Sequence, residues 1–138
     1  MKNNNIEKIL YKIKYNAKES SNQDNNFTEY HTRFDCTLTY NNVTYNFDFQ
    51  CNTDYTKPTK EVVLSSVLLD SRCYLDSKVN DDDIDNLAQF QALFGYENIK
   101  DLLKAYEGCK NAYNHISKMF TQEEQENLYN YLEEKGMI

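Results

Sequence analysis

Hydrophobic residues follow three successive patterns along the chain, and each pattern predicts a different kind of element. In residues 6–15 the apolar positions fit helical spacing (Ile6, Ile9, Leu10, Ile13) and also alternate as in a strand (Ile9, Tyr11, Ile13, Tyr15). We favour a short N-terminal helix whose tail runs into an extended segment. Residues 16–28 are polar and aperiodic, which predicts a mobile loop.

Strict alternation of apolar and polar residues predicts a β-hairpin over residues 31–51. Asn tolerates positive φ, so Asn41-Asn42 can form a two-residue primed turn that pairs position 40 with 43, 38 with 45, 36 with 47 and 34 with 49. The same register sets Asp35 opposite Asp48, a like-charge pair that needs neutralising. Arg33 on the diagonal is the expected partner, and a cation or a Lys of another protein is the alternative. The hairpin edge invites strand addition, or a third strand from residues 13–15 or 28–32.

Helical spacing dominates the rest of the chain, from residue 57 to residue 138. Thr59 can cap a helix whose apolar positions 62, 63, 64, 67, 68 and 69 cover more than half its circumference, so we expect that helix to be buried on most sides. So short an apolar run is also compatible with a strand. Residues 71–77 either continue the helix or form a loop.

Three more helices are predicted after this one. The first runs from about Asp82 to Phe94 and ends at Gly95. The second runs from a cap at Asn98 to position 120; its Gly108 suggests close helix packing, and its His115 should lie at the surface. The third begins at the capping box of residues 121–124 and ends at Gly136. Together these patterns predict a single α+β domain, residues 1–138, in which a small antiparallel sheet packs against a layer of about four helices.

Charge is distributed unevenly over the 138 residues, whose formal net charge is −7. Residues 1–20 hold five Lys and two acidic residues, while residues 21–138 hold ten basic and twenty acidic residues. An acidic body repels nucleic-acid phosphates, so we expect no direct binding of nucleic acid. The same acidity suits docking against a basic surface of a protein partner.

The four cysteines have no metal-type or redox spacing, and the polar, charged N-terminus does not resemble a signal peptide. No apolar run is long enough to span a membrane, so we expect a cytoplasmic protein with reduced thiols. The acidic run of residues 81–85 lacks the alternating ligands, Gly and distal Glu of a calcium loop. We interpret it as the acidic start of a helix that can also face a partner, and we expect no metal or cofactor.

Enzyme signatures are absent from the sequence. Three Gly residues cannot form a phosphate-binding Gly-rich loop, and His31 and His115 lack the spacing of a metal or Cys-His site. An enzyme with an unrecognised site is therefore the weakest of the function classes considered.

The succession Lys57-Pro58-Thr59, Leu68-Leu69-Asp70, Phe94-Gly95-Tyr96, and Phe120-Thr121 followed by Glu123-Glu124 resembles a family of small, mostly uncharacterised phage and prophage proteins of low-GC Gram-positive bacteria. The resemblance covers roughly residues 56–134. It supplies no active site, but it implies a phage accessory protein similar to anti-CRISPR and other anti-defence inhibitors that act by stoichiometric binding.

The leading hypothesis is thus an anti-CRISPR inhibitor, not an enzyme, that occupies a basic nucleic-acid site of a CRISPR effector in the host cytoplasm. The alternative is a phage structural or regulatory protein that self-associates as a homodimer through the hairpin edge. The residues expected to bind the partner are all acidic: Asp81, Asp82, Asp83, Asp85, Glu123, Glu124 and Glu126.

Overall fold

The computed structural model describes residues 2–20, 31–52, 56–77 and 99–138, together with residues 88, 91, 92 and 95. It is an α+β fold, as predicted, with a three-stranded antiparallel sheet in the order β1-β2-β3. In chain order the elements are α1 (Lys2–Lys12), β1 (Lys14–Glu19), β2 (His31–Tyr40), β3 (Val43–Asn52), α2 (Lys60–Ser77), α4 (Ile99–Met119) and α5 (Gln122–Glu134).

The hairpin of β2 and β3 has the predicted turn and register. Asn41 and Asn42 have φ values of 51° and 63°, as a primed turn requires, and Tyr40 pairs with Val43. Asp35 does stand opposite Asp48, and Arg33 neutralises the pair on the diagonal, with Nη2 3.0 Å from Asp48 Oδ2. Lys18 of β1 lies opposite Asp35 on its other side, so the row of charges across the sheet is balanced.

The N-terminal segment contains both a helix and a strand, the two structures that its hydrophobic pattern allows. A helix ends at Lys12, and an extended strand begins two residues later. The prediction of a loop from residue 16 was wrong for residues 16–19, because β1 continues to Glu19; these polar residues form a strand because they pair with β2 from Thr37 to Phe34. The remaining residues of that predicted loop, from 21 onward, lie outside the described ranges.

Two long-range hydrogen bonds fasten this segment to the start of α2. Tyr15 donates its hydroxyl to the carbonyl of Pro58, and Lys60 Nζ lies 2.8 Å from the carbonyl oxygen of Leu10. The Leu10 carbonyl belongs to the last turn of α1, where a cation also complements the helix dipole.

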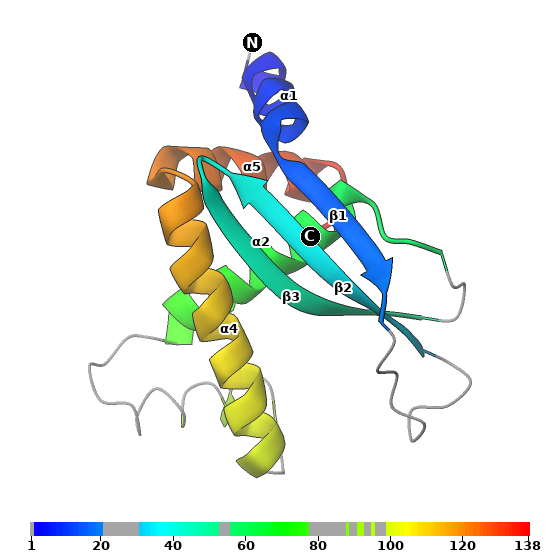
Figure 1. Ribbon diagram of the computed structural model, residues 1–138. Helices are drawn as coiled ribbons and strands as arrows, with labels where there is room; N and C mark the ends of the chain where they lie inside the picture. Colours follow the sequence, from blue (N-terminus) through cyan, green and yellow to red (C-terminus); the bar gives the residue numbers. More distant parts are fainter. Residues whose placement is uncertain are drawn as a thin grey trace.

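Helices α2, α4 and α5 lie on one side of the sheet (Figure 1). In this view α2 crosses behind the strands, α5 lies behind their upper end, α4 runs beside β3, and α1 extends beyond the sheet.

Thr59 caps α2 as predicted, accepting a bond from the Val62 amide at 3.3 Å. Residues 71–77, which the sequence left open, continue α2 to Ser77.

The core forms where the inner face of the sheet meets α2, the second half of α4 and α5. Fully buried side chains come from each of these elements, among them Leu38, Leu64, Ile116 and Leu132. A second cluster joins Tyr74 of α2 to Leu102, Tyr106 and Cys109 of α4. None of the helices in the described ranges is long and apolar enough to cross a membrane.

Several details of the helical prediction need correction. Helix α2 is buried on most sides, as predicted, but Val62 and Leu69, which are 38% and 42% exposed, present one apolar edge to solvent. Gly108 is exposed and a Cβ there would meet nothing within 4 Å, so it marks no close helix packing. His115 is half-buried against Tyr45 rather than at the free surface.

The predicted helix from about Asp82 to Phe94 lies mostly outside the described residues. Within it, Ala88, Gln91 and Ala92 are helical. Gly95 follows with a φ of +66° and donates its amide to the Gln91 carbonyl at 2.7 Å, which is how Gly ends a helix.

Candidate functional site

The first two turns of α5 carry the three glutamates that the sequence singles out, Glu123, Glu124 and Glu126. The capping box is present in full: the Glu124 amide donates to Thr121 Oγ1 at 3.1 Å, and the Thr121 amide donates to Glu124 Oε1 at 2.9 Å. This box fixes where α5 begins and which way its first side chains point. It also gives the Glu124 side chain a structural role that distinguishes it from Glu123 and Glu126.

Glu124 points toward the sheet and holds a structural position. Its second carboxylate oxygen, Oε2, accepts a hydrogen bond from the Tyr40 hydroxyl at 3.0 Å. Burial, this hydrogen bond and the nearby negative charge together raise the pKa of Tyr40, so the phenol stays a donor. Both carboxylate oxygens of Glu124 thus have partners within the chain, and the side chain is only half exposed.

The turn between β2 and β3 contacts the end of α4, next to the start of α5. Tyr40 stacks on Phe120 with ring centroids 4.9 Å apart, and Asn41 Nδ2 donates to the Met119 carbonyl at 3.1 Å. The Met119 carbonyl belongs to the last turn of α4, so the turn satisfies an end group that the helix itself leaves open. These contacts of the hairpin turn therefore hold the connection between α4 and α5 in place.

Glu123 and Glu126 are exposed to solvent on the other side of α5. Of the seven acidic residues predicted to bind a partner, these two are displayed at the described surface. Asp81, Asp82, Asp83 and Asp85 lie outside the described residues, so the structure does not place them beside α5 or apart from it.

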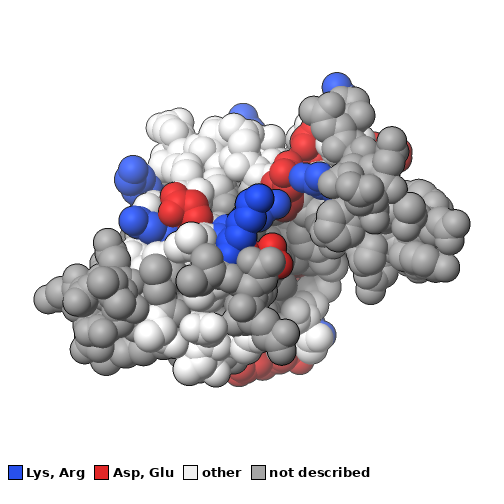
Figure 2. Space-filling view, turned by 90° about the horizontal axis from the view of Figure 1, so that it is seen from below, with Lys and Arg blue, Asp and Glu red and all other residues white. Residues whose placement is uncertain are grey.

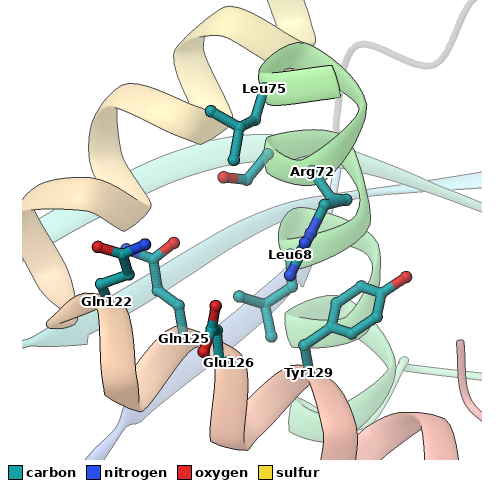
Figure 3. A pocket seen from close by; sticks show the side chains of 8 residues that line it. Leu68, Arg72, Leu75, Gln122, Gln125, Glu126 and Tyr129 are labelled. Carbon is teal, nitrogen blue, oxygen red and sulfur yellow. The ribbon is translucent and has the colours of Figure 1, made fainter. Parts of the chain in front are cut away.

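A groove runs between α2 and α5 and includes Glu126 (Figure 3). Each helix contributes four positions with the spacing i, i+3, i+4, i+7, which is one face of a helix. From α2 they are Leu68, Ser71, Arg72 and Leu75. From α5 they are Gln122, Gln125, Glu126 and Tyr129. The space between the side chains has a volume of about 60 Å³, and we call this feature the α2–α5 groove.

The floor of the groove combines one apolar and one polar residue, and its walls are mainly polar. Leu68 and Ser71 are buried at its base, while Leu75 is 48% exposed at its rim. The Arg72 guanidinium lies 4.8 Å from the centre of the Tyr129 ring, and Figure 3 shows it reaching from α2 toward α5. Glu126 supplies the opposite charge from α5. A groove of this kind can bind an apolar or aromatic side chain at its centre, while Arg72 and Glu126 can pair with charged side chains beside it.

A second group of titratable side chains lies where α2, α4 and β3 meet. Burial, followed by the nearby Asp70 carboxylate, raises the pKa of Cys109 and of Tyr45 to about 12 each. Burial raises the pKa of Asp70 itself to about 6, and burial with the neighbouring carboxylates raises that of Cys73. Both thiols are thus held protonated at neutral pH, which makes them poor nucleophiles.

His115 stacks on Tyr45, with ring centroids 4.4 Å apart, and its Nδ1 lies 2.8 Å from the Asn111 carbonyl oxygen. Over the residues that the structure describes, no three His, Cys, Asp or Glu side chains gather closely enough to hold a metal ion. We therefore interpret this second group as part of the packing between α2 and α4.

Charge on the described part of the chain is balanced. These residues contain fourteen Lys and Arg and fourteen Asp and Glu, so the excess of seven negative charges falls entirely in residues 21–30, 53–55 and 78–98. In the view from below, Figure 2 shows basic and acidic side chains beside one another on the described part of that face. The described framework is neutral because the Lys residues of positions 1–20 balance the rest. The described part of the predicted acidic body, residues 21–138, holds nine basic and twelve acidic residues and is therefore still acidic.

The sequence analysis did not identify the groove residues other than Glu126. A signal was present, because residues 68, 71, 72 and 75 and residues 122, 125, 126 and 129 have identical spacing. Helical spacing alone, however, does not say that two faces converge. That convergence depends on how α2 crosses α5, which only the tertiary structure supplies.

No protein-family model matches the chain, and neither the curated proteins nor the solved structures contain a match. The resemblance to a phage family accordingly remains a prediction.

Proposed function

We propose that this protein is a phage or prophage anti-defence protein, specifically an anti-CRISPR inhibitor that binds a nucleic-acid-binding effector stoichiometrically through acidic side chains. It acts by occupying a basic surface of the effector and thereby excluding nucleic acid. The proposal assigns the chain a binding role rather than a catalytic one.

The observation that carries the proposal is a dense run of negative charge in the sequence. Four acidic residues lie within five positions, at Asp81, Asp82, Asp83 and Asp85. A local density of this kind attracts a basic surface more strongly than the same charge spread evenly, because Coulomb attraction falls with distance and with screening by salt.

Glu123 and Glu126 can add to that attraction from the described surface. Both are exposed, and they stand on the first two turns of a helix that the capping box holds in place. Glu124 is the least suited of the predicted residues, because a partner would compete with Tyr40 and with the Thr121 amide for its carboxylate.

The test combines binding and competition. A tagged protein is incubated with lysates of Gram-positive hosts that express CRISPR effectors, washed at low and at high salt, and any captured effector is challenged with its target nucleic acid. We expect an effector to be captured at low salt, to be released at high salt, and to compete with nucleic acid.

A quadruple variant, Asp81→Asn, Asp82→Asn, Asp83→Asn and Asp85→Asn, should weaken capture at least roughly a hundredfold, since loss of each charge-assisted contact costs about 1 kcal/mol or more. The matched control neutralises four exposed acids of the framework: Asp76→Asn, Glu107→Gln, Glu133→Gln and Glu134→Gln. The control changes net charge equally but should leave capture within about threefold of the unchanged protein. Equal loss in both variants, or capture that survives the first one, contradicts the proposal.

The second candidate is a phage structural or regulatory protein that self-associates. The structure bears on the surface it would use, because β1 pairs with β2 and so covers one edge of the hairpin. The outer strands of the sheet are β1 and β3, and His115 of α4 stacks on Tyr45 of β3. Concentration-dependent self-association in a protein that captures no effector would favour this candidate.

A further inference from the structure

Tyr11 of α1 is the most exposed large hydrophobic side chain on the described surface, at 88%. The buried side of the same helix is formed by Ile6 and Leu10, which are 3% and 7% exposed and belong to the main core. Tyr11 therefore points away from the body of its own chain. A single exposed aromatic is not unusual, so its surroundings decide whether it has a role.

Charged side chains surround Tyr11 on the outward face of α1. Glu7 and Lys8 lie one helical turn before Tyr11, Lys12 follows it directly, and all three are exposed. Together with Tyr11 they line a shallow depression. The pattern is thus an aromatic ring with two positive charges on one side of the helix and one negative charge on the other. Tyr is favoured in such positions at interfaces because its ring is rigid and has a polar end.

The α2–α5 groove presents the complementary pattern. Leu75 and Tyr129 offer apolar surface at its rim and wall, Glu126 with the exposed Glu123 offers negative charge along α5, and Arg72 offers positive charge from α2. Lys8 and Lys12 are opposite in charge to Glu123 and Glu126. Glu7 is opposite in charge to Arg72. Complementarity in both signs specifies a partner more narrowly than net charge does.

We propose that α1 of one copy docks into the α2–α5 groove of a second copy, with Tyr11 inserted between Leu75 and Tyr129. The groove cannot receive α1 of its own chain in this way, because that helix packs on the body through Ile6 and Leu10 and turns Tyr11 outward. A two-fold dimer makes the contact twice, which doubles the buried surface. This inference shares Glu123 and Glu126 with the anti-defence proposal, but it does not involve residues 81–85, so the two are tested by different variants.

Sedimentation velocity over a range of protein concentrations, at low and at high salt, tests the docking. We expect a reversible dimer that is weaker at high salt. Tyr11→Ala, Lys12→Glu and Glu126→Lys should each raise the dimer dissociation constant roughly tenfold or more. All three side chains are exposed, so the variants should keep the native circular dichroism spectrum.

Mixing two variants gives the sharpest readout. Lys12→Glu and Glu126→Lys, each impaired alone, should dimerise with one another about as well as the unchanged protein, because opposite charges then meet in both contacts of the mixed pair. The matched controls are Leu103→Ala, which shortens another half-exposed hydrophobic side chain, and Lys104→Glu, which reverses an exposed charge on α4. Neither control should change the dissociation constant by more than about twofold.

Three results would overturn the inference. The first is a protein that stays monomeric at every concentration. The second is a dimer that tolerates Tyr11→Ala and both charge reversals, which would point to another surface such as β3. The third is a mixture of the two charge variants that associates no better than either variant alone.

Discussion

Helix α2 has two sides that are built differently. Toward α4 it presents Tyr74, which is 6% exposed and contacts the rings of Tyr106 and Tyr113 with centroids 5.5 Å and 5.1 Å away. Toward the rim of α5 it presents Arg72 and Leu75, and the space between the helices is open to solvent. The difference indicates that the α4 side holds the fold together, while the α5 side remains available for a ligand or partner.

Removing the Tyr74 side chain should have the largest effect on stability. Tyr74→Ala deletes a buried ring and leaves two aromatic neighbours unpacked, so we expect a loss of about 3–4 kcal/mol in the free energy of unfolding. Urea unfolding at neutral pH, followed by circular dichroism, measures it. The matched control on the other side is Tyr129→Ala, which should cost about 1 kcal/mol because this ring is only half-buried. Equal costs would mean that the two sides of α2 do not differ.

Asp70 gives an intermediate effect that depends on pH. Burial raises its pKa to about 6, above its ordinary value of 3.8, so between these values the native state binds more protons than the unfolded state. The contribution of this group to stability is therefore present below about pH 4 and is lost as the pH rises through about 6. Asp70→Asn should stabilise the protein by about 1–2 kcal/mol at pH 7 and by almost nothing at about pH 4, allowing for the partial exposure of the side chain.

Urea unfolding at several pH values checks this prediction, with Asp76→Asn as the control. Asp76 is an exposed residue on the same helix, so its replacement removes a carboxylate from the surface of α2 rather than a buried one. The same gain from Asp70→Asn at acidic and neutral pH would show that its charge is not the cause.

The smallest effect is expected at the groove. Arg72 and Tyr129 form a cation–π contact at a half-exposed position, for which we expect a coupling energy of about 0.5 kcal/mol. A double-mutant cycle with Arg72→Met and Tyr129→Leu measures it. A coupling energy above about 2 kcal/mol would indicate that this contact closes the groove as part of the fold.

The hairpin and the helix ends were predictable because local chemistry determines them. Asn41-Asn42 sets the turn, the turn sets the register, and Thr121 with Glu124 sets the start of α5. The strand at residues 16–19 was not predicted, because Ala17 is its one apolar residue, and pairing with β2 and burial of Ala17 in the core hold it extended. Tertiary pairing here overrides local preference.

The candidate site was predictable only in part, for a related reason. The sequence identifies acidic positions but not their orientation, so it could not separate Glu124, which bonds to Tyr40 and Thr121, from the exposed Glu123 and Glu126. Nor could it show that Arg72 lies across from α5, since that depends on the crossing of two helices.

The Asn41 side chain connects two events that belong to different stages of folding. The turn it forms with Asn42 is local, so the hairpin can close early and at little entropic cost. Its bond to the Met119 carbonyl joins residues 78 positions apart and can form only after α4 has docked. Loss of that bond should therefore act on the unfolding rate and leave the folding rate nearly unchanged, which makes this one amide a contributor to the lifetime of the native state.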